Sequence, residues 1–293
     1  MGGRGASSHL TKGGGGLADY PKLKPAFEAL KRELGEKHAE AMLALIMKAP
    51  ADVRALWEDY GGRFKVNALR AGENSMAAYF SPADDAVHFE IKNGDSWVFH
   101  KSYAGPAYTT IFHEFGHMSS SLIARELTQS LVAQDYAGVY KGKDSAGNLI
   151  LNRKYPILYS SAGALGDSLR EELEGHIDRV RQQYYWGDYA TSRSYVASRL
   201  VLEIKDKYGS DYKKYTGDIS DMLEGAGIGF SHPLGLGHGL DYWHRFDVGV
   251  EAFAEMTAAS ISNPKSLQGI KDYFPKSYDV YTEMIKARRK KND

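Results

Sequence analysis

The sequence predicts an α+β fold that is mostly helical, with a small antiparallel-rich sheet and a helical insertion. Three observations support this prediction. Apolar residues recur every three or four positions in residues 25–48, the period of an amphipathic helix. Apolar and polar residues alternate in residues 64–69 and 86–91, the period of a half-buried strand. Residues 111–123 return to the helical period and carry two histidines four positions apart.

The N-terminal end divides into a tail and the start of a folded domain. Residues 1–16 contain seven glycines and almost no side chain that a core would bury, so we expect a disordered tail there. The remaining residues, 17–293, should form one folded domain. In it the first helix should break near Gly35, and a second short helix should follow Pro50 and end at Gly61.

The predicted sheet comes from residues 64–69, 76–80 and 86–91, with a turn at residues 81–85. Their alternation indicates a small antiparallel sheet with one buried face.

The helical insertion is expected over residues 127–223, with helices at residues 168–185 and 189–208. It is rich in tyrosine, and such side chains pack between helices or form the wall of an interface or substrate groove. A short helix at residues 262–270 and a final helix should complete the domain.

Composition excludes several classes of protein. The 37 basic and 37 acidic residues cancel, so no global field recruits nucleic acid or an anionic membrane, and we expect neither as a partner. There is no apolar leader and no run of about 18 apolar residues, so we expect no signal peptide, no membrane span, and a cytoplasmic or virion-associated location. The chain has no cysteine, so a zinc ion would need His, Asp or Glu ligands.

The strongest chemical signal is the pentapeptide His-Glu-Phe-Gly-His at residues 113–117. In this H-E-x-x-H pattern, the imidazoles of His113 and His117 lie on one helix face and can hold one zinc ion. Glu114 is then placed to take a proton from a water molecule that the metal activates. A catalytic zinc needs a third protein ligand, which must come from elsewhere in the chain.

The best candidate for that ligand lies about 130 residues downstream. Glu251 and Glu255 are one helical turn apart among small and apolar residues, where two carboxylates are costly to bury without partners. The simplest interpretation is that Glu251 binds the metal and Glu255 accepts a hydrogen bond from a ligand imidazole. Two alternatives stay open: both glutamates face solvent, or the third ligand is Glu174 or His176 of the insertion.

A resemblance to known proteins now becomes visible. The sequences at residues 113–117 and 251–255 (Glu-Ala-Phe-Ala-Glu), with Asn263-Pro264 and residues 273–278, resemble the gluzincin class of zincin metallopeptidases, especially the catalytic domain of the anthrax lethal factor family. Residues 1–8 and 237–243 resemble zincin-like proteins encoded among bacteriophage head genes. The resemblance implies a zincin-like metallopeptidase fold, with the two ligand helices further apart in sequence than in that family.

The resemblance also implies roles for individual residues. His113, His117 and Glu251 would be the Zn²⁺ ligands, Glu114 the general base, and Glu255 the acid that orients an imidazole.

Three further residues are candidates near the site. The family's oxyanion-stabilising tyrosine lies seven residues before the third ligand, where this chain has His244, with Tyr242 two residues earlier. Either side chain can donate a hydrogen bond to an oxyanion. His238, in a glycine-rich stretch at residues 225–239, either lines the cleft or is a surface loop histidine.

The sequence therefore predicts a zinc metallopeptidase that hydrolyses peptide bonds by a zinc-activated water with Glu114 as base, acting on a peptide or protein substrate. One alternative is a phage structural or assembly protein that keeps the fold without turnover and has phage particle components as partners. The other is a partner-binding module in which zinc only stabilises the fold.

Overall fold

The computed structural model describes residues 17–69, 78–101, 105–132, 140–143, 149–151, 161–184, 192–243 and 247–289. The predicted tail at residues 1–16 and the candidate His244 lie outside this part of the chain. The helices are α1 (Lys24–Leu34), α2 (Glu36–Lys48), α3 (Ala51–Tyr60), α4 (Thr109–Val132), α5 (Ser161–Gln183), α6 (Arg193–Tyr208), α7 (Lys213–Gly225), α8 (Leu240–Trp243), α9 (Val248–Ser262), α10 (Pro264–Tyr273) and α11 (Pro275–Arg289). The strands are β1 (Val66–Ala68), β2 (Tyr79–Ser81), β3 (Ala86–Phe89), β4 (Tyr140–Lys143) and β5 (Leu149–Leu151).

The helix-rich composition with two small sheets confirms the α+β prediction. Gly35 separates α1 from α2 with a φ of +83°, a backbone conformation that favours glycine. Pro50 precedes α3, which ends at the residue before Gly61, as predicted. By contrast, α5 begins at Ser161, earlier than the predicted residue 168, in a small-residue segment where Gly166 approaches the start of α9.

The three-stranded sheet has the order β1-β3-β2 and is mixed. β2 and β3 form the expected antiparallel hairpin, but β1 runs parallel to β3, with Val66 opposite Val87. The prediction of a small antiparallel sheet was therefore confirmed for β2 and β3 and wrong for β1 and β3. Alternation reports which face of a strand is buried but not its direction, and no hairpin joins β1 to β3, since β2 lies between them in sequence.

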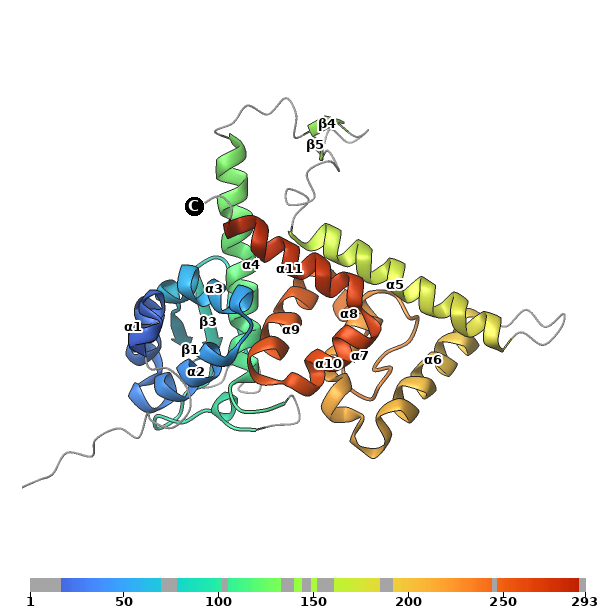
Figure 1. The fold of residues 1–293 in the computed structure, drawn as a ribbon, viewed down its shortest axis with the longest axis horizontal. Helices are drawn as coiled ribbons and strands as arrows, with labels where there is room; N and C mark the ends of the chain where they lie inside the picture. The colour runs from blue at the N-terminus through green and yellow to red at the C-terminus, as the bar shows by residue number, and fades with distance from the viewer. Residues whose placement is uncertain are drawn as a thin grey trace, which may run out of the picture.

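Helix α4 stands between the two halves of the fold (Figure 1). It packs against β2 and β3 on one side and against α9 on the other. Its apolar face is buried, and Phe115 stacks on Trp57 of α3 with ring centroids 3.7 Å apart. This packing fixes the rotation of α4 about its axis, and therefore the direction of His113 and His117 on a different face.

Helix α9 is the most enclosed element that the structure describes, with all but one of its residues buried. It approaches α4 closely at Gly116, where an added Cβ atom would lie 2.6 Å from Cα of Ala254. Because Gly116 has no side chain, the backbones of α4 and α9 approach closely. The two halves of the predicted metal site, on α4 and α9, thereby face each other.

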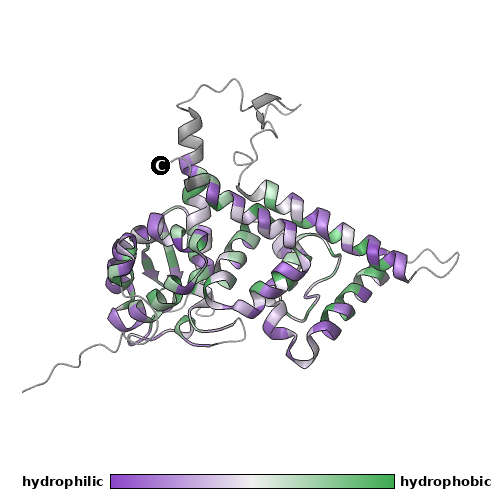
Figure 2. Cartoon of the chain, in the orientation of Figure 1, coloured by the Kyte–Doolittle hydropathy of each residue, from purple (hydrophilic) through white to green (hydrophobic). Residues whose placement is uncertain are grey.

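The helices of the predicted insertion, α5 to α7, belong to the same packed body. α5 packs against α9 and α11, and α7 packs against α9 and α10. Hydrophilic and hydrophobic residues alternate along α5, α6 and α11, as expected for amphipathic helices (Figure 2). Tyr208 stacks on Tyr215 with centroids 4.7 Å apart, and its hydroxyl donates to Oδ2 of Asp272 at 2.6 Å, so these tyrosines pack between helices.

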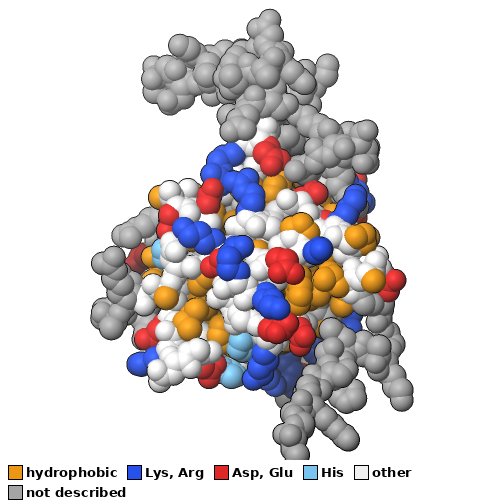
Figure 3. Space-filling model, turned by 90° about the vertical axis from the view of Figure 1, so that its left-hand side faces the viewer, with side chains coloured by type: hydrophobic (Ala, Val, Ile, Leu, Met, Phe, Trp, Pro, Cys, Tyr) orange, Lys and Arg blue, Asp and Glu red, His pale blue; other side chains and the backbone are white. Residues whose placement is uncertain are grey.

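On the face shown in Figure 3, basic and acidic side chains of the described residues are interspersed with apolar ones. Among the described residues, no helix is long and apolar enough to cross a membrane.

Candidate metal centre

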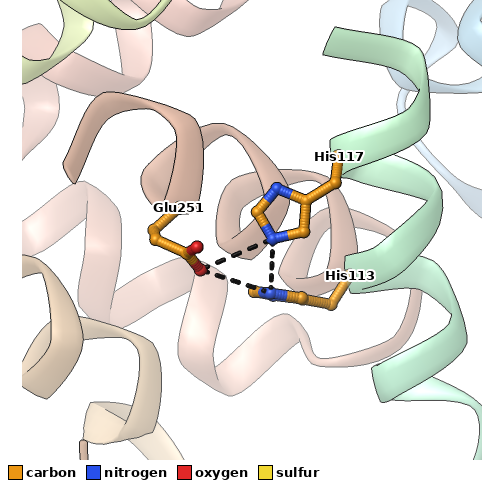
Figure 4. A group of neighbouring side chains, drawn as sticks. All are labelled: His113, His117 and Glu251. Atoms are coloured by element: carbon orange, nitrogen blue, oxygen red, sulfur yellow. Dashed lines mark hydrogen bonds and ion pairs between the residues drawn. The ribbon is translucent and has the colours of Figure 1, made fainter. Parts of the chain in front are cut away.

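Two imidazoles from α4 form one half of the centre. His113 and His117 are one turn apart, and their Nε2 atoms lie 3.0 Å from each other, with the rings nearly perpendicular. Figure 4 shows both rings pointing from α4 toward α9. Two nitrogens directed at one point in this way are typical of a shared metal ion.

Glu251 of α9 completes a triangle of ligand atoms. Its Oε2 lies 3.5 Å from Nε2 of His113 and 3.5 Å from Nε2 of His117 (Figure 4). The carboxylate is 4% exposed, and Oε2 has no hydrogen-bond partner among the described residues. Ligands about 2.0 Å from a tetrahedral zinc are separated by about 3.3 Å, so the three atoms fit a zinc ion and account for the unpartnered oxygen. Within the described part of the chain, these three residues are the ones that cluster suitably for a metal.

Glu255, one turn after Glu251, contacts the other nitrogen of His113. Its Oε2 lies 3.4 Å from Nδ1 of that imidazole, which leaves Nε2 directed at the triangle. Burial lowers the pKa of His113, but the negative charge of Glu255 and the nearby acceptor oxygens of both glutamates outweigh it and hold the pKa well above its usual value. Burial raises the pKa of Glu251, and the two imidazoles outweigh this and lower it, so Glu251 is a carboxylate, the form that binds metals.

Glu114 lies beside the triangle and lines a cleft that opens onto it. It is 5% exposed and accepts a hydrogen bond from the backbone of Phe80 in β2. Burial raises its pKa above the ordinary value for a glutamate, against the opposing charge of His113 and His117. A carboxylate with a raised pKa is a stronger base, which suits proton transfer near neutral pH.

Tyr242 of α8 reaches the centre from a third element. Its hydroxyl donates a hydrogen bond to Oε1 of Glu251, the oxygen that does not face the imidazoles. Burial and the charge of Glu251 raise its pKa, so the phenol stays protonated and acts as a donor. The alternative oxyanion donor, His244, lies outside the described residues.

His238 lines the cleft. Its ring stacks on Tyr242 with centroids 4.0 Å apart, and its Nε2 lies 3.9 Å from Oε2 of Glu251. Burial lowers its pKa, so the imidazole is neutral near pH 7.

The competing third ligands lie elsewhere. Glu174 pairs with Arg193 at 2.7 Å, and Nε2 of His176 lies 2.7 Å from the carbonyl oxygen of Tyr273. Neither belongs to the metal-type cluster of the described residues, so the structure brings Glu251, and not these two, to the histidines.

Three acids of α7 were missed by the sequence reasoning. Asp218, Asp221 and Glu224, which we call the α7 acids, are all buried or largely buried, and Asp218 and Asp221 line the cleft. Their spacing of three residues along a helix with buried Ile219, Met222 and Leu223 is the signal that was available.

Asp218 supports Glu255 from behind. Burial raises the pKa of Asp218 well above its usual value, with a further contribution from the charge of Glu255. Its carboxyl is hydrogen-bonded to Glu255 and accepts from Oγ of Ser266 at 2.5 Å. A neutral Asp218 can donate to Glu255 and so hold it in contact with His113.

Asp221 and Glu224 fix the glycine-rich loop that carries His238. The backbone N–H of His238 donates to Oδ1 of Asp221 at 2.9 Å. Glu224 accepts from the backbone N–H groups of His232 and Gly239 at 2.9 Å each, and from Nε1 of Trp243 at 3.1 Å. The loop is therefore tied to α7 through hydrogen bonds to two of its acids.

A cleft of about 810 Å³ opens onto the centre. His113, Glu114, Asp218, Asp221, His238 and Glu255 line it, together with four lysines and several apolar and small residues. This volume suits a ligand the size of several amino-acid residues.

Comparisons of the chain with family models, curated proteins and solved structures found no match. The resemblance to gluzincins and to phage head proteins therefore stays a prediction based on the sequence.

Proposed function

We propose that this chain is a zinc metallopeptidase of the gluzincin type that hydrolyses peptide bonds in a peptide or protein substrate. The observation that carries the proposal is the convergence of His113, His117 and Glu251 on one point, beside a cleft that His113 and Glu114 line. A site that only stabilised the fold would need no buried carboxylate at the position of Glu114 and no access for a ligand.

The side chains divide the chemistry among them. A zinc ion held by the three ligands would supply a Lewis acid that polarises the scissile carbonyl and activates a water molecule. Glu114 takes the proton of that water and passes it to the leaving amine, a role supported by its raised pKa. Tyr242 stays protonated and donates a hydrogen bond, which orients Glu251 in the resting site.

The test combines metal analysis with a peptidase assay on the full chain. Glu114→Gln should keep stoichiometric zinc and lose hydrolysis by about 10²-fold or more. Glu251→Ala should lose or weaken zinc binding, because it removes one of three ligands. Glu203→Gln, on α6 away from the cleft and paired with Arg179, is the matched control and should behave as the parent.

Two outcomes would contradict the proposal. Cleavage by Glu114→Gln at the parental rate would exclude this residue as the base. Full zinc occupancy without hydrolysis of any peptide would instead support the binding or structural alternatives. Unfolding on removal of the zinc by a chelator would then indicate a metal that only stabilises the fold.

A further inference from the structure

We infer that the cleft selects peptides with an acidic side chain two or three residues from the bond that is cleaved. Four lysines at the outer part of the cleft bind this side chain. This inference rests on the proposed peptidase function and specifies its substrate class. We call these lysines, Lys101, Lys213, Lys214 and Lys265, the lysine rim.

The lysine rim is assembled from three separate segments. Lys213 and Lys214 lie in the first turn of α7, and Lys265 lies in the first turn of α10. Lys101 lies in the connection between β3 and α4. All four are exposed, and all four line the same cleft as His113 and Glu114. The positive ends of two helices, α7 and α10, add to the potential of the ammonium groups there.

Nearby acids do not cancel the positive charge. Asp211 pairs with Lys214 at 2.7 Å, and Lys265 lies over the ring of Tyr215 at 5.2 Å from its centroid. Lys101 and Lys213 have no ion pair with any residue that the structure describes. Within the lysine rim itself, one paired acid against four lysines leaves an excess of cations, in a chain whose total charge is zero. Such an excess in a cleft concentrates anionic ligands.

The geometry of α7 sets the distance between the lysine rim and the reacting bond. A helix rises about 1.5 Å per residue, so Lys214 lies about 6 Å along the axis from Asp218 and about 10 Å from Asp221. Asp218 contacts Glu255, which contacts His113, so the metal centre lies beside the middle of α7. An extended peptide advances about 3.3 Å per residue, so a substrate carboxylate two or three residues from the scissile bond reaches the lysines.

The acids around the metal make a phosphate backbone a poor occupant of the whole cleft. Glu114, Glu251 and Glu255 surround the imidazoles, and their three carboxylates exceed the charge of one Zn²⁺ ion, so the deep part repels a uniformly anionic polymer. A peptide with a neutral scissile segment and an acidic flank meets the opposite requirements of the two parts of the cleft.

The experiment uses the zinc-loaded full chain and a peptide library in which Asp, Ser or Lys is placed at each of four positions on either side of the scissile bond. Asp two or three residues from that bond, on one side, should raise kcat/KM about 5- to 10-fold over Ser, and Lys should lower it. Lys213→Glu with Lys214→Glu should invert this preference. Lys22→Glu with Lys24→Glu, two exposed lysines just before α1 and at its first position, is the matched control and should keep it.

A second measurement separates this inference from the proposed function. Zinc-loaded Glu114→Gln should bind the acidic peptide at least about fivefold more tightly than the Ser peptide, and the difference should shrink at high salt. Cleavage without preference for acidic peptides would overturn the inference and leave the peptidase function intact. Preferential binding of acidic peptides without cleavage of any peptide would overturn the peptidase function and leave the preference for acidic peptides standing. Tighter binding of a single-stranded oligonucleotide than of any peptide would overturn the substrate class in favour of nucleic acid.

Discussion

The imidazole of His113 is held between two glutamates of one helix: its Nε2 lies 3.5 Å from Oε2 of Glu251, and its Nδ1 lies 3.4 Å from Oε2 of Glu255. Because the two acids are one turn apart on α9, a single packed helix supplies both a candidate ligand and the group that orients another ligand.

Replacing Glu255 should weaken zinc binding without removing a ligand. Glu255→Ala leaves Nδ1 of His113 without its acceptor, so zinc affinity should fall about 10- to 100-fold. Competition with a chromophoric chelator measures this affinity, and Glu203→Ala, on α6 away from the cleft, is the control. Equal affinities for parent and variant would show that Glu255 does not orient the imidazole.

The contact at Gly116 should be intolerant of a methyl group. Gly116→Ala places a Cβ atom against the backbone of Ala254, so the free energy of unfolding should drop by about 1–3 kcal/mol. Zinc affinity should fall as well, because α4 and α9 move apart. Chemical denaturation and the chelator titration report the two effects.

Gly175 provides the control for that substitution. It lies exposed within α5, and an added Cβ atom meets nothing within 4 Å. Gly175→Ala should stabilise the chain by about 0.5–1 kcal/mol through helix propensity. A gain in stability from Gly116→Ala as well would contradict the close approach of the two helices.

Glu224 should hold the loop that carries His238. Glu224→Gln leaves one acceptor oxygen in place of two, so it cannot accept from His232, Gly239 and Trp243 together. Amide hydrogen exchange at residues 232–243 should quicken, reflecting a local loss of about 1–3 kcal/mol, while exchange in α2 stays unchanged. Unaltered exchange in the loop would show that these bonds do not tether it.

Tyr242 and His244 can be separated by their effects on zinc binding and on turnover. Tyr242→Phe removes the donor to Glu251, so zinc affinity should fall about 10- to 100-fold. At saturating zinc, a further loss of about 10²-fold in kcat would identify Tyr242 as the oxyanion donor. The same loss of kcat in His244→Ala, but not in Tyr242→Phe, would assign that role to His244.

Asp218 should make the stability of the metal-free protein fall as the pH rises. Its folded pKa is raised, chiefly by burial, whereas in the unfolded chain it ionises near pH 4. Between these values the folded state keeps a proton that the unfolded state has lost, so the free energy of unfolding decreases with increasing pH. Asp218→Asn removes this loss because an amide does not ionise. The amide can still donate to Glu255 and accept from Ser266, so the local contacts are kept.

The measurement for Asp218 is chemical denaturation at pH 4 and pH 8 with a chelator present. The variant should match the parent near pH 4 and exceed it by about 1–2 kcal/mol at pH 8. Asp279→Asn, exposed on α11, serves as the control and should show no such gain. A variant less stable than the parent at pH 8 would contradict a neutral Asp218.

Local patterns in the sequence predicted much of the fold correctly. The break at Gly35 and the bounds of α3 follow from glycine and proline chemistry, which acts within a few residues. The direction of β1 was not predictable in this way, because it depends on which strand lies beside β3 in space. The start of α5 was missed for a similar reason, since packing against α9, and not apolar periodicity, holds its first turns.

The candidate site was predictable where its residues share one helix. His113 and His117 on α4, and Glu251 and Glu255 on α9, carry a spacing of four that places each pair on one face. The α7 acids were overlooked because charged residues at spacing three usually mark a solvated face, and only tertiary packing shows that this face is buried. The lysine rim has no local signal at all, since its members come from three segments.

The close approach at Gly116 also has a consequence for the newly synthesised chain. The ligands on α4 and α9 are separated by about 130 residues, so the contact between these helices has a long loop to close and forms late. Until α9 has left the ribosome, His113 and His117 have no carboxylate opposite them. The nascent chain is thus expected to carry no complete metal site until α9 has been synthesised, and any hydrolytic capacity would arise only after that point.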